Sequence, residues 1–265
     1  MSLYVNETGT PGSPSIIFLH GVGTSGWMWG KQIATLGDFH CLNVDLPGHG
    51  RSNHVPWVSL TDTADQIAAI IQAHATNGKA HIVGLSLGGH IVLLLLEYHA
   101  DMLNRVIISG VTAAPMPNRV LLPVHLWLMS VQMRRRSLVE RQAEAMHVPP
   151  EMRSAFTENL LAMSMEAYRR ICKEVAYCHV PDSLRSVRVP TLITAGSRES
   201  KIITQGVRVI SEMMPDAEGW FAPGLGHGWN VEDPSLFNAM IRAWITDAPL
   251  PSRLQAANGG GGTSS

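Results

Sequence analysis

Short apolar runs alternate with longer amphipathic segments along most of the chain. A run such as residues 15–19 is continuously hydrophobic, which is typical of a strand covered on both faces. The pattern predicts strands at 15–19, 40–44, 80–84, 105–109, 191–195 and 218–221, and helices at 27–36, 61–75, 87–99, 201–214 and 234–245. Strands that alternate with helices imply an α/β fold, with a mostly parallel, doubly wound sheet and helices on both faces.

One long segment interrupts this alternation. Residues 111–187 are helical in composition and rich in methionine, a side chain that fills irregular apolar space. We therefore expect a helical lid inserted between two strands of the sheet. The predicted organisation is a core at 1–110, the lid at 111–187, the rest of the core at 188–248 and a flexible tail at 249–265, which ends in NGGGGTSS.

The composition limits the classes of protein to which this chain can belong. The chain has 265 residues, 45% of them hydrophobic and 15% charged, and a net charge of -1, so nothing indicates nucleic acid as a partner. Three cysteines without paired spacing favour a reducing compartment, and we expect a cytoplasmic protein without a membrane span. Neither metal-ligand spacing nor a phosphate-binding loop occurs, so no metal and no cofactor are expected. The oligomeric state stays open.

The sequence Gly84-Leu85-Ser86-Leu87-Gly88 lies between a predicted strand and a predicted helix. Ser86 is either a small residue in a tight turn or a nucleophile held on a strained elbow. The flanking glycines favour the nucleophile, because side chains at these positions would collide with the neighbouring strand and helix. The helix that starts here also directs its positive end toward developing negative charge.

A serine nucleophile needs a base and hydrogen-bond donors for the oxyanion. His227 lies in the glycine-rich loop PGLGHG after the last predicted strand, and its place in chain order makes it the candidate base; His90 and His99 are expected on helix surfaces. The loop His20-Gly21-Val22-Gly23 follows the first predicted strand. We expect the backbone N–H groups of Val22 and Leu87 to form the oxyanion hole.

The motifs HGVGTSG, DLPGHGRS, GLSLGG and GLGHG, in this order, resemble those of the α/β-hydrolase superfamily. The likeness spans about residues 15–245 apart from most of the lid, and the motif style is similar to that of the enol-lactonase and carboxylesterase branch. It implies the α/β-hydrolase fold and a serine hydrolase mechanism. It also implies that Asp45 and His49, in DLPGHGRS, are architectural.

The resemblance further implies an acidic residue a few positions after the strand that follows the lid. Gly196-Ser197-Arg198-Glu199 matches that position, with glutamate where the family usually has aspartate. We therefore expect Glu199 to orient His227, because glutamate also serves in such triads. Asp182 and Asp216 remain alternatives, although neither matches the family position.

These residues predict a serine hydrolase acting on a small to medium apolar carboxylic ester, lactone or thioester through an acyl-enzyme. The alternatives are a ligand-binding receptor of the same fold with little turnover, and a perhydrolase or C–C bond hydrolase that uses the same triad. The substrate pocket is expected to involve aromatic and methionine side chains after the oxyanion loop and in the lid, namely Trp27, Met28, Trp29, Met129, Met133 and Met163.

Overall fold

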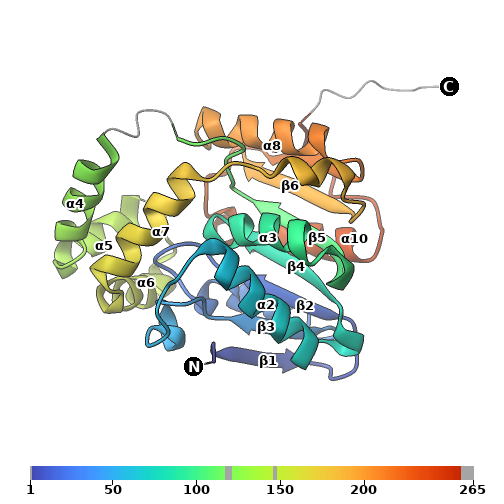
Figure 1. The fold of residues 1–265 in the computed structure, drawn as a ribbon, viewed down its shortest axis with the longest axis horizontal. Helices are drawn as coiled ribbons and strands as arrows, with labels where there is room; N and C mark the ends of the chain where they lie inside the picture. Colours follow the sequence, from blue (N-terminus) through green and yellow to red (C-terminus); the bar gives the residue numbers. More distant parts are fainter. Residues whose placement is uncertain (1, 117–120, 146–147, 258–265) are drawn as a thin grey trace.

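A computed structural model describes residues 2–116, 121–145 and 148–257 of the chain. These residues form an eight-stranded sheet with the strand order β1-β3-β2-β4-β5-β6-β7-β8 (Figure 1). Strands β2 to β7 are paired in parallel, whereas β1 and β8 pair antiparallel at the two edges. The strands are β1 Val5–Gly9, β2 Ser15–Leu19, β3 His40–Val44, β4 Ala80–Leu85, β5 Leu103–Ser109, β6 Thr191–Gly196, β7 Ala217–Ala222 and β8 Gln255–Ala256.

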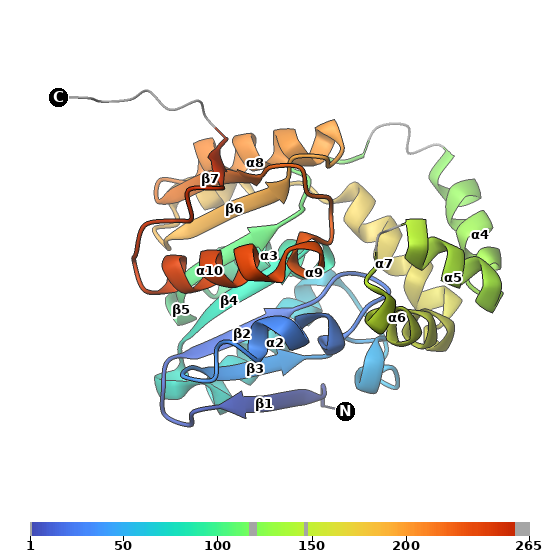
Figure 2. The same ribbon diagram turned by 180° about the vertical axis from the view of Figure 1, so that it is seen from behind.

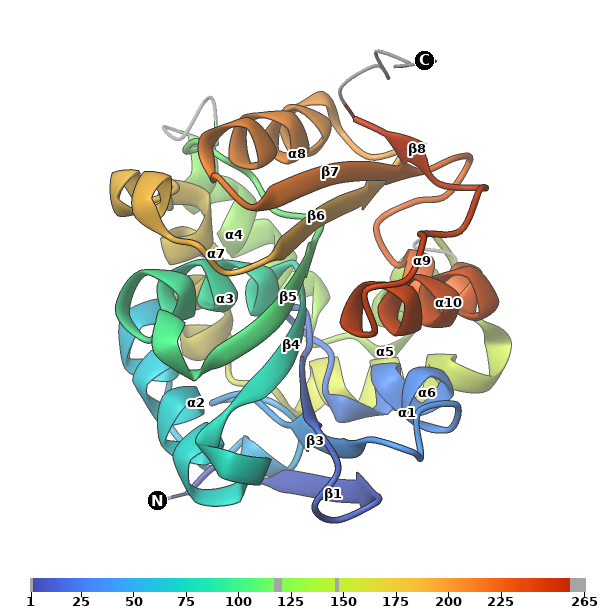
Figure 3. The same cartoon turned by 90° about the vertical axis from the view of Figure 1, so that its right-hand side faces the viewer.

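Helices cover both faces of this sheet. Helices α2, α3 and α8 lie on one face, and α1, α9 and α10 on the other, as the end-on view shows (Figure 3). The helices are α1 Gly30–Ile33, α2 Leu60–His74, α3 Leu87–Tyr98, α4 Leu122–Gln132, α5 Arg136–Ala145, α6 Pro150–Ala162, α7 Met165–Tyr177, α8 Lys201–Met213, α9 Trp229–Glu232 and α10 Pro234–Ile245. The predicted doubly wound α/β sheet is therefore confirmed.

The central strands show why the apolar runs are continuous. Ile17 and Leu19 of β2 belong to the hydrophobic cluster under α2 and α3, whereas Ile16 and Phe18 belong to the cluster under α10. Successive side chains of a strand point to opposite faces, so a strand with two covered faces carries consecutive apolar residues, as at residues 16–19. All five positions of β2 are buried.

Helices α4 to α7 lie between β5 and β6 in the sequence, within the segment 111–187. In space they form a group beside the sheet, at the carboxyl ends of the parallel strands (Figures 1 and 2). We refer to them as the helical insertion. No helix in the described part of the chain combines the length and apolarity needed to cross a membrane.

Several local expectations need correction. The hydrophobic pattern predicts no strand at β1, because the sequence VNETG has no apolar run and its pairing depends on backbone hydrogen bonds at a sheet edge. The predicted helix 27–36 is a 3-10 turn at Gly26–Trp29 followed by the short α1. His90 is buried inside α3 rather than on its surface, and burial lowers the pKa of its imidazole to about 4.

The expected flexible tail 249–265 is only partly described. Within it, β8 pairs with β7, and Leu254 and Ala257 are buried against the sheet and its helices. The apolar contacts of these two side chains explain why the chain is held in place here. The glycine-rich residues 258–265 lie outside the described part of the chain.

Candidate active site

Ser86 occupies a strained turn between β4 and α3. Its φ of 55° and ψ of -111° lie outside the regions that non-glycine residues usually adopt. The turn is held by two backbone hydrogen bonds, one from the Ser86 N–H to the Ser109 oxygen (2.8 Å) and one from the His90 N–H to the Ser86 oxygen (3.0 Å). The surrounding structure therefore imposes the conformation that exposes this side chain.

Close approach of the backbone explains the glycines on either side. A Cβ atom at Gly84 would lie 2.7 Å from the Gly88 oxygen, and one at Gly88 would lie 2.2 Å from the Leu19 oxygen. Real Cβ atoms do not approach a backbone oxygen so closely. Both positions of the elbow motif thus require glycine for packing, as the sequence pattern predicts.

The loop after β2 carries Val22, which lines the same cavity as Ser86. The Gly21 oxygen accepts hydrogen bonds from His20 Nδ1 (2.8 Å) and from the Thr24 hydroxyl (2.8 Å). Because the carbonyl and the following N–H point in opposite directions in a trans peptide, these donors turn the Val22 N–H away from them. A Cβ at Gly21 would lie 3.6 Å from Ser86 Cβ, so this loop borders the serine.

His20 acts as a neutral donor in this loop. Burial lowers the pKa of His20 to about 4, against the opposing effect of its hydrogen bond with Gly21. Its Nε2 accepts the Leu46 N–H (3.0 Å), which leaves the proton on Nδ1 to be donated to Gly21. The second candidate donor, the Leu87 N–H, is the first of α3 and therefore has no acceptor within its own helix.

Glu199 and His227 form a close pair. His227 Nδ1 lies 2.7 Å from Glu199 Oε2, and the Glu199 side chain is 2% exposed. Burial lowers the pKa of His227, but the hydrogen bond with Glu199 and the charge of its carboxylate outweigh burial and raise that pKa above its ordinary value. The carboxylate therefore fixes the ring and favours its protonated form.

The end of β5 makes room for this pair. Gly110 has a φ of +69°, and a Cβ there would lie 2.8 Å from His227 Cε1 and 3.2 Å from Glu199 Oε1. The loop that carries His227 is held at the same strand end, because the buried Trp229 donates its indole N–H to the Ser109 hydroxyl (3.0 Å). Any residue with a Cβ atom at position 110 would force His227 and Glu199 to move.

The alternative acids lie elsewhere. Asp182 is 93% exposed at its side chain and faces Arg185, and Asp216 faces Arg188 just before β7. The start of β7 is at the amino end of the parallel strands, opposite the end where His227 lies. Among Asp182, Asp216 and Glu199, only Glu199 is hydrogen-bonded to His227.

Asp45 and His49 have structural roles in the loops near Ser86. Asp45 accepts the N–H groups of Gly26 (2.7 Å) and Arg51 (2.8 Å), so its carboxylate joins the loop after β2 to the turn after β3. His49 is buried, with its ring edge against His20, and burial lowers its pKa to about 3. Both residues stabilise the loops that border Ser86.

A cavity of about 560 Å³ lies beside Ser86 and His227. Its size is in the range of small-molecule sites, and its walls are mostly apolar. Ser86, His227 and Val22 all border it. The cavity is lined by Gly21, Val22, Thr24, Trp27, Met28, Leu85, Ser86, Val148, Phe156, Arg198, Gly226, His227, Gly228, Asn230, Val231 and Glu232.

The expected pocket residues divide into two groups. Trp27 and Met28 line the cavity. Trp29 does not, because it is fully buried on the opposite side of its turn, where it packs against Phe18 and Phe237. Met129, Met133 and Met163 are also absent from the cavity wall and pack into the apolar interior around the helical insertion.

Sequence reasoning missed several residues of the wall. Val148, just before α6, and Phe156 of α6 belong to the wall, and the segment around His227 contributes Asn230 and Glu232. No local motif marks them, since they meet only when α6 and α9 pack over the strand ends. Among the described residues, no group of three His, Cys, Asp or Glu side chains is arranged to hold a metal ion.

Comparison with known proteins places this geometry in a family. The profile of the alpha/beta hydrolase family matches residues 16–240. The chain is 28% identical to an AB hydrolase superfamily protein of Gibberella zeae over 91% of this chain and 83% of that protein. It is 26% identical to 3-oxoadipate enol-lactonase 1 of Acinetobacter baylyi over 92% of this chain and 93% of that enzyme.

Solved structures agree at the level of the fold. An esterase from Exiguobacterium antarcticum superposes with a TM-score of 0.78 at 20% identity, over 92% of this chain and 95% of that one. The profile match covers the strained serine, both loops of the His–Glu pair and the whole helical insertion. The chain therefore belongs to the alpha/beta hydrolase family.

Proposed function

We propose that the protein is a serine hydrolase that cleaves small to medium apolar carboxylic esters, lactones or thioesters. The observation that carries the proposal is the strained Ser86 at a cavity that it shares with His227, whose Nδ1 is bonded to a buried carboxylate. The similarity to an enol-lactonase supports the same class of reaction. The apolar walls favour an acyl group without charge.

The reaction proceeds in two stages. Ser86 Oγ attacks the acyl carbonyl while His227 Nε2 takes the hydroxyl proton, and the Val22 and Leu87 N–H groups bind the oxyanion. The C–O or C–S bond breaks as His227 returns the proton to the leaving group. Water then attacks the acyl-enzyme, giving its proton to His227, and the acid departs as Ser86 is reprotonated. Glu199 stabilises the imidazolium in both stages.

Turnover of short p-nitrophenyl esters by the wild type and Ser86→Ala tests this proposal. We expect the substitution to lower kcat by about 10⁶, the magnitude known for a related serine triad. Equal rates in the two proteins would end the assignment of Ser86. A ligand that raises the melting temperature without being consumed would favour the receptor alternative. Products other than the free acid and alcohol would favour perhydrolysis or C–C bond cleavage.

A further inference from the structure

Glu232, the last residue of α9, borders the cavity and has no role in the reaction described above. Both of its carboxylate oxygens are engaged. Oε1 accepts the Gly226 N–H at 3.1 Å, and Oε2 accepts Arg198 Nη2 at 2.9 Å. The Glu232 side chain is only 14% exposed, although the Arg198 side chain that pairs with it is 55% exposed.

The two partners of Glu232 occupy equivalent places in the chain. Gly226 immediately precedes His227, and Arg198 immediately precedes Glu199. One carboxylate thus joins the loop after β7 to the loop after β6, one residue ahead of each member of the His–Glu pair. A Cβ at Gly226 would lie 2.8 Å from Glu232 Oε1, which shows how closely the carboxylate approaches this backbone.

The two loops are also joined by hydrogen bonds that do not involve Glu232. The Arg198 N–H donates to the Leu225 oxygen (3.0 Å), and the Gly224 N–H donates to the Ser197 hydroxyl (2.8 Å). These bonds set the separation of the loops near their strand ends. Glu232 instead acts from the cavity side, where its charge is balanced by Arg198.

We propose that Glu232 is a positioning residue that, together with Arg198, holds Glu199 against His227. This inference rests on the proposed function. A displacement of about 1 Å in a catalytic group can cost on the order of 100-fold in rate. The contacts of Glu232 next to Glu199 and His227 therefore matter for turnover. Arg198 also neutralises Glu232, which prevents this second carboxylate from competing with Glu199 for the charge of His227.

The test compares Glu232→Ala, Glu232→Gln and Arg198→Ala in steady-state hydrolysis. Glu232→Ala removes both ties, and we expect kcat to fall about 10- to 100-fold with little change in KM. Glu232→Gln keeps an acceptor for Gly226 and should recover part of this loss. Arg198→Ala and Glu232→Ala should not be additive, because each breaks the same bridge.

Arg253→Ala is the matched control. Arg253 pairs with Asp233, the residue next to Glu232, at 2.8 Å and with similar exposure, but this pair ties the C-terminal segment to the start of α10. The control should keep the wild-type kcat. Melting temperatures of all variants separate loss of the fold from loss of alignment.

The pKa of His227 supplies a readout that does not depend on turnover. If Glu232 holds the His–Glu pair together, NMR titration of the imidazole in Glu232→Ala should give a lower pKa for His227 than in the wild type. A wild-type kcat and a wild-type His227 pKa in Glu232→Ala would overturn the proposal, as would an equal loss of kcat in Arg253→Ala. If instead Ser86→Ala were as active as the wild type, the proposed function would fail, and the titration would still decide the role of Glu232.

Discussion

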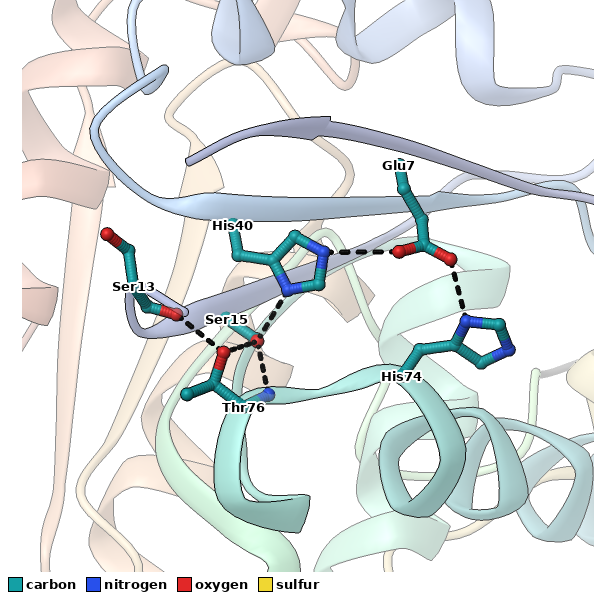
Figure 4. Close-up of polar contacts among 6 residues, drawn as sticks. All are labelled: Glu7, Ser13, Ser15, His40, His74 and Thr76. Carbon is teal, nitrogen blue, oxygen red and sulfur yellow. Dashed lines mark hydrogen bonds and ion pairs between the residues drawn. The ribbon is translucent and has the colours of Figure 1, made fainter. Parts of the chain in front are cut away.

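The two ends of the parallel sheet each bring a serine, a histidine and a glutamate together. At the carboxyl ends, Glu199 bonds to His227, which shares the cavity with Ser86. At the amino ends, Ser15 Oγ lies 3.1 Å from His40 Nδ1, and His40 Nε2 lies 3.2 Å from a carboxylate oxygen of Glu7 (Figure 4). We call Glu7, Ser15, His40, His74 and Thr76 the amino-end cluster.

The environment of each serine differs. Ser15 is fully buried in regular strand β2, and its oxygen accepts the Thr76 N–H at 2.9 Å. The carboxylate of Glu7 is shared with His74, whose Nδ1 is 2.6 Å away (Figure 4). The amino-end cluster therefore links β1, β2, β3 and the turn after α2. Ser86, by contrast, has a strained backbone and borders a cavity.

This contrast shows that three residue types in contact do not make an active site. Reaction also requires access for a substrate and N–H donors placed for the oxyanion. Ser86 borders a cavity that Val22 also lines, and the proposed oxyanion donors lie at this cavity, whereas Ser15 is fully buried. The hydroxyl of Ser15 serves as a structural hydrogen-bond centre, which satisfies polar groups at the start of buried strands.

The sharpest test of the comparison is covalent labelling with a fluorophosphonate. We expect one adduct per chain, on Ser86, because this serine combines a strained backbone with a cavity that it shares with His227. Ser15→Ala should label at the wild-type rate, whereas Ser86→Ala should not label at all. Intact-mass measurement and peptide mapping give the result, and an adduct on Ser15 would break the distinction between the two ends.

The two carboxylates provide the next test. Glu199→Gln should lower kcat by about 10⁴, since an amide does not stabilise the imidazolium. Glu7→Gln, which makes the matching change in the amino-end cluster, should leave kcat unchanged. Steady-state hydrolysis of a p-nitrophenyl ester measures both. A near-normal rate in Glu199→Gln would mean that the protein works as a Ser–His dyad.

Gly110→Ala tests the packing around the His–Glu pair. The added Cβ meets His227 Cε1 at 2.8 Å and imposes a side chain on a backbone with φ of +69°. We expect kcat to fall about 10- to 100-fold through misalignment of the pair. Gly12→Ala is a suitable control, because that glycine also has a positive φ but no atom within 4 Å of its Cβ position. A rate equal to that of the control would show that the pair tolerates displacement.

The smallest expected effect concerns pH. His227 must be neutral to act as a base, so kcat/KM is lost as the pH falls through the pKa of this residue. Because Glu199 raises that pKa, the acid limb should lie above the ordinary value of about 6.5. The same shift means that the pair stabilises the fold most at low pH and less as the pH rises through the raised pKa. A pH–rate profile with its acid limb below the ordinary value would contradict the assignment.

Much of the sheet could be predicted because buried strands carry a local signal. The continuous run of β2 and the glycines around Ser86 each reflect contacts that any sequence must satisfy there. Strand β1 has the polar sequence VNETG, so nothing in its pattern distinguishes it from a loop. Its position depends on hydrogen bonds to β3, which are independent of side-chain polarity.

The candidate site was predictable to a similar degree. Ser86, Glu199 and His227 each follow a strand and belong to a recognisable motif. The sequence therefore predicts that they lie at the same edge of the sheet. Trp27, Met28 and Trp29 are consecutive, and only the geometry of their 3-10 turn decides that Trp29 faces the core. Arg198 and Glu232 are separated by many residues, and their meeting depends on how two loops pack.

The cavity wall has a consequence for how such an enzyme diversifies. Ser86, Glu199 and His227 follow strand ends, whereas Val148 and Phe156 are what the described part of the segment 111–187 supplies to the wall. The insertion joins the core through the segments after β5 and before β6, so recombination at these two junctions exchanges it as one unit. Such an exchange would change the shape of the cavity while Ser86, His227 and Glu199 are inherited intact.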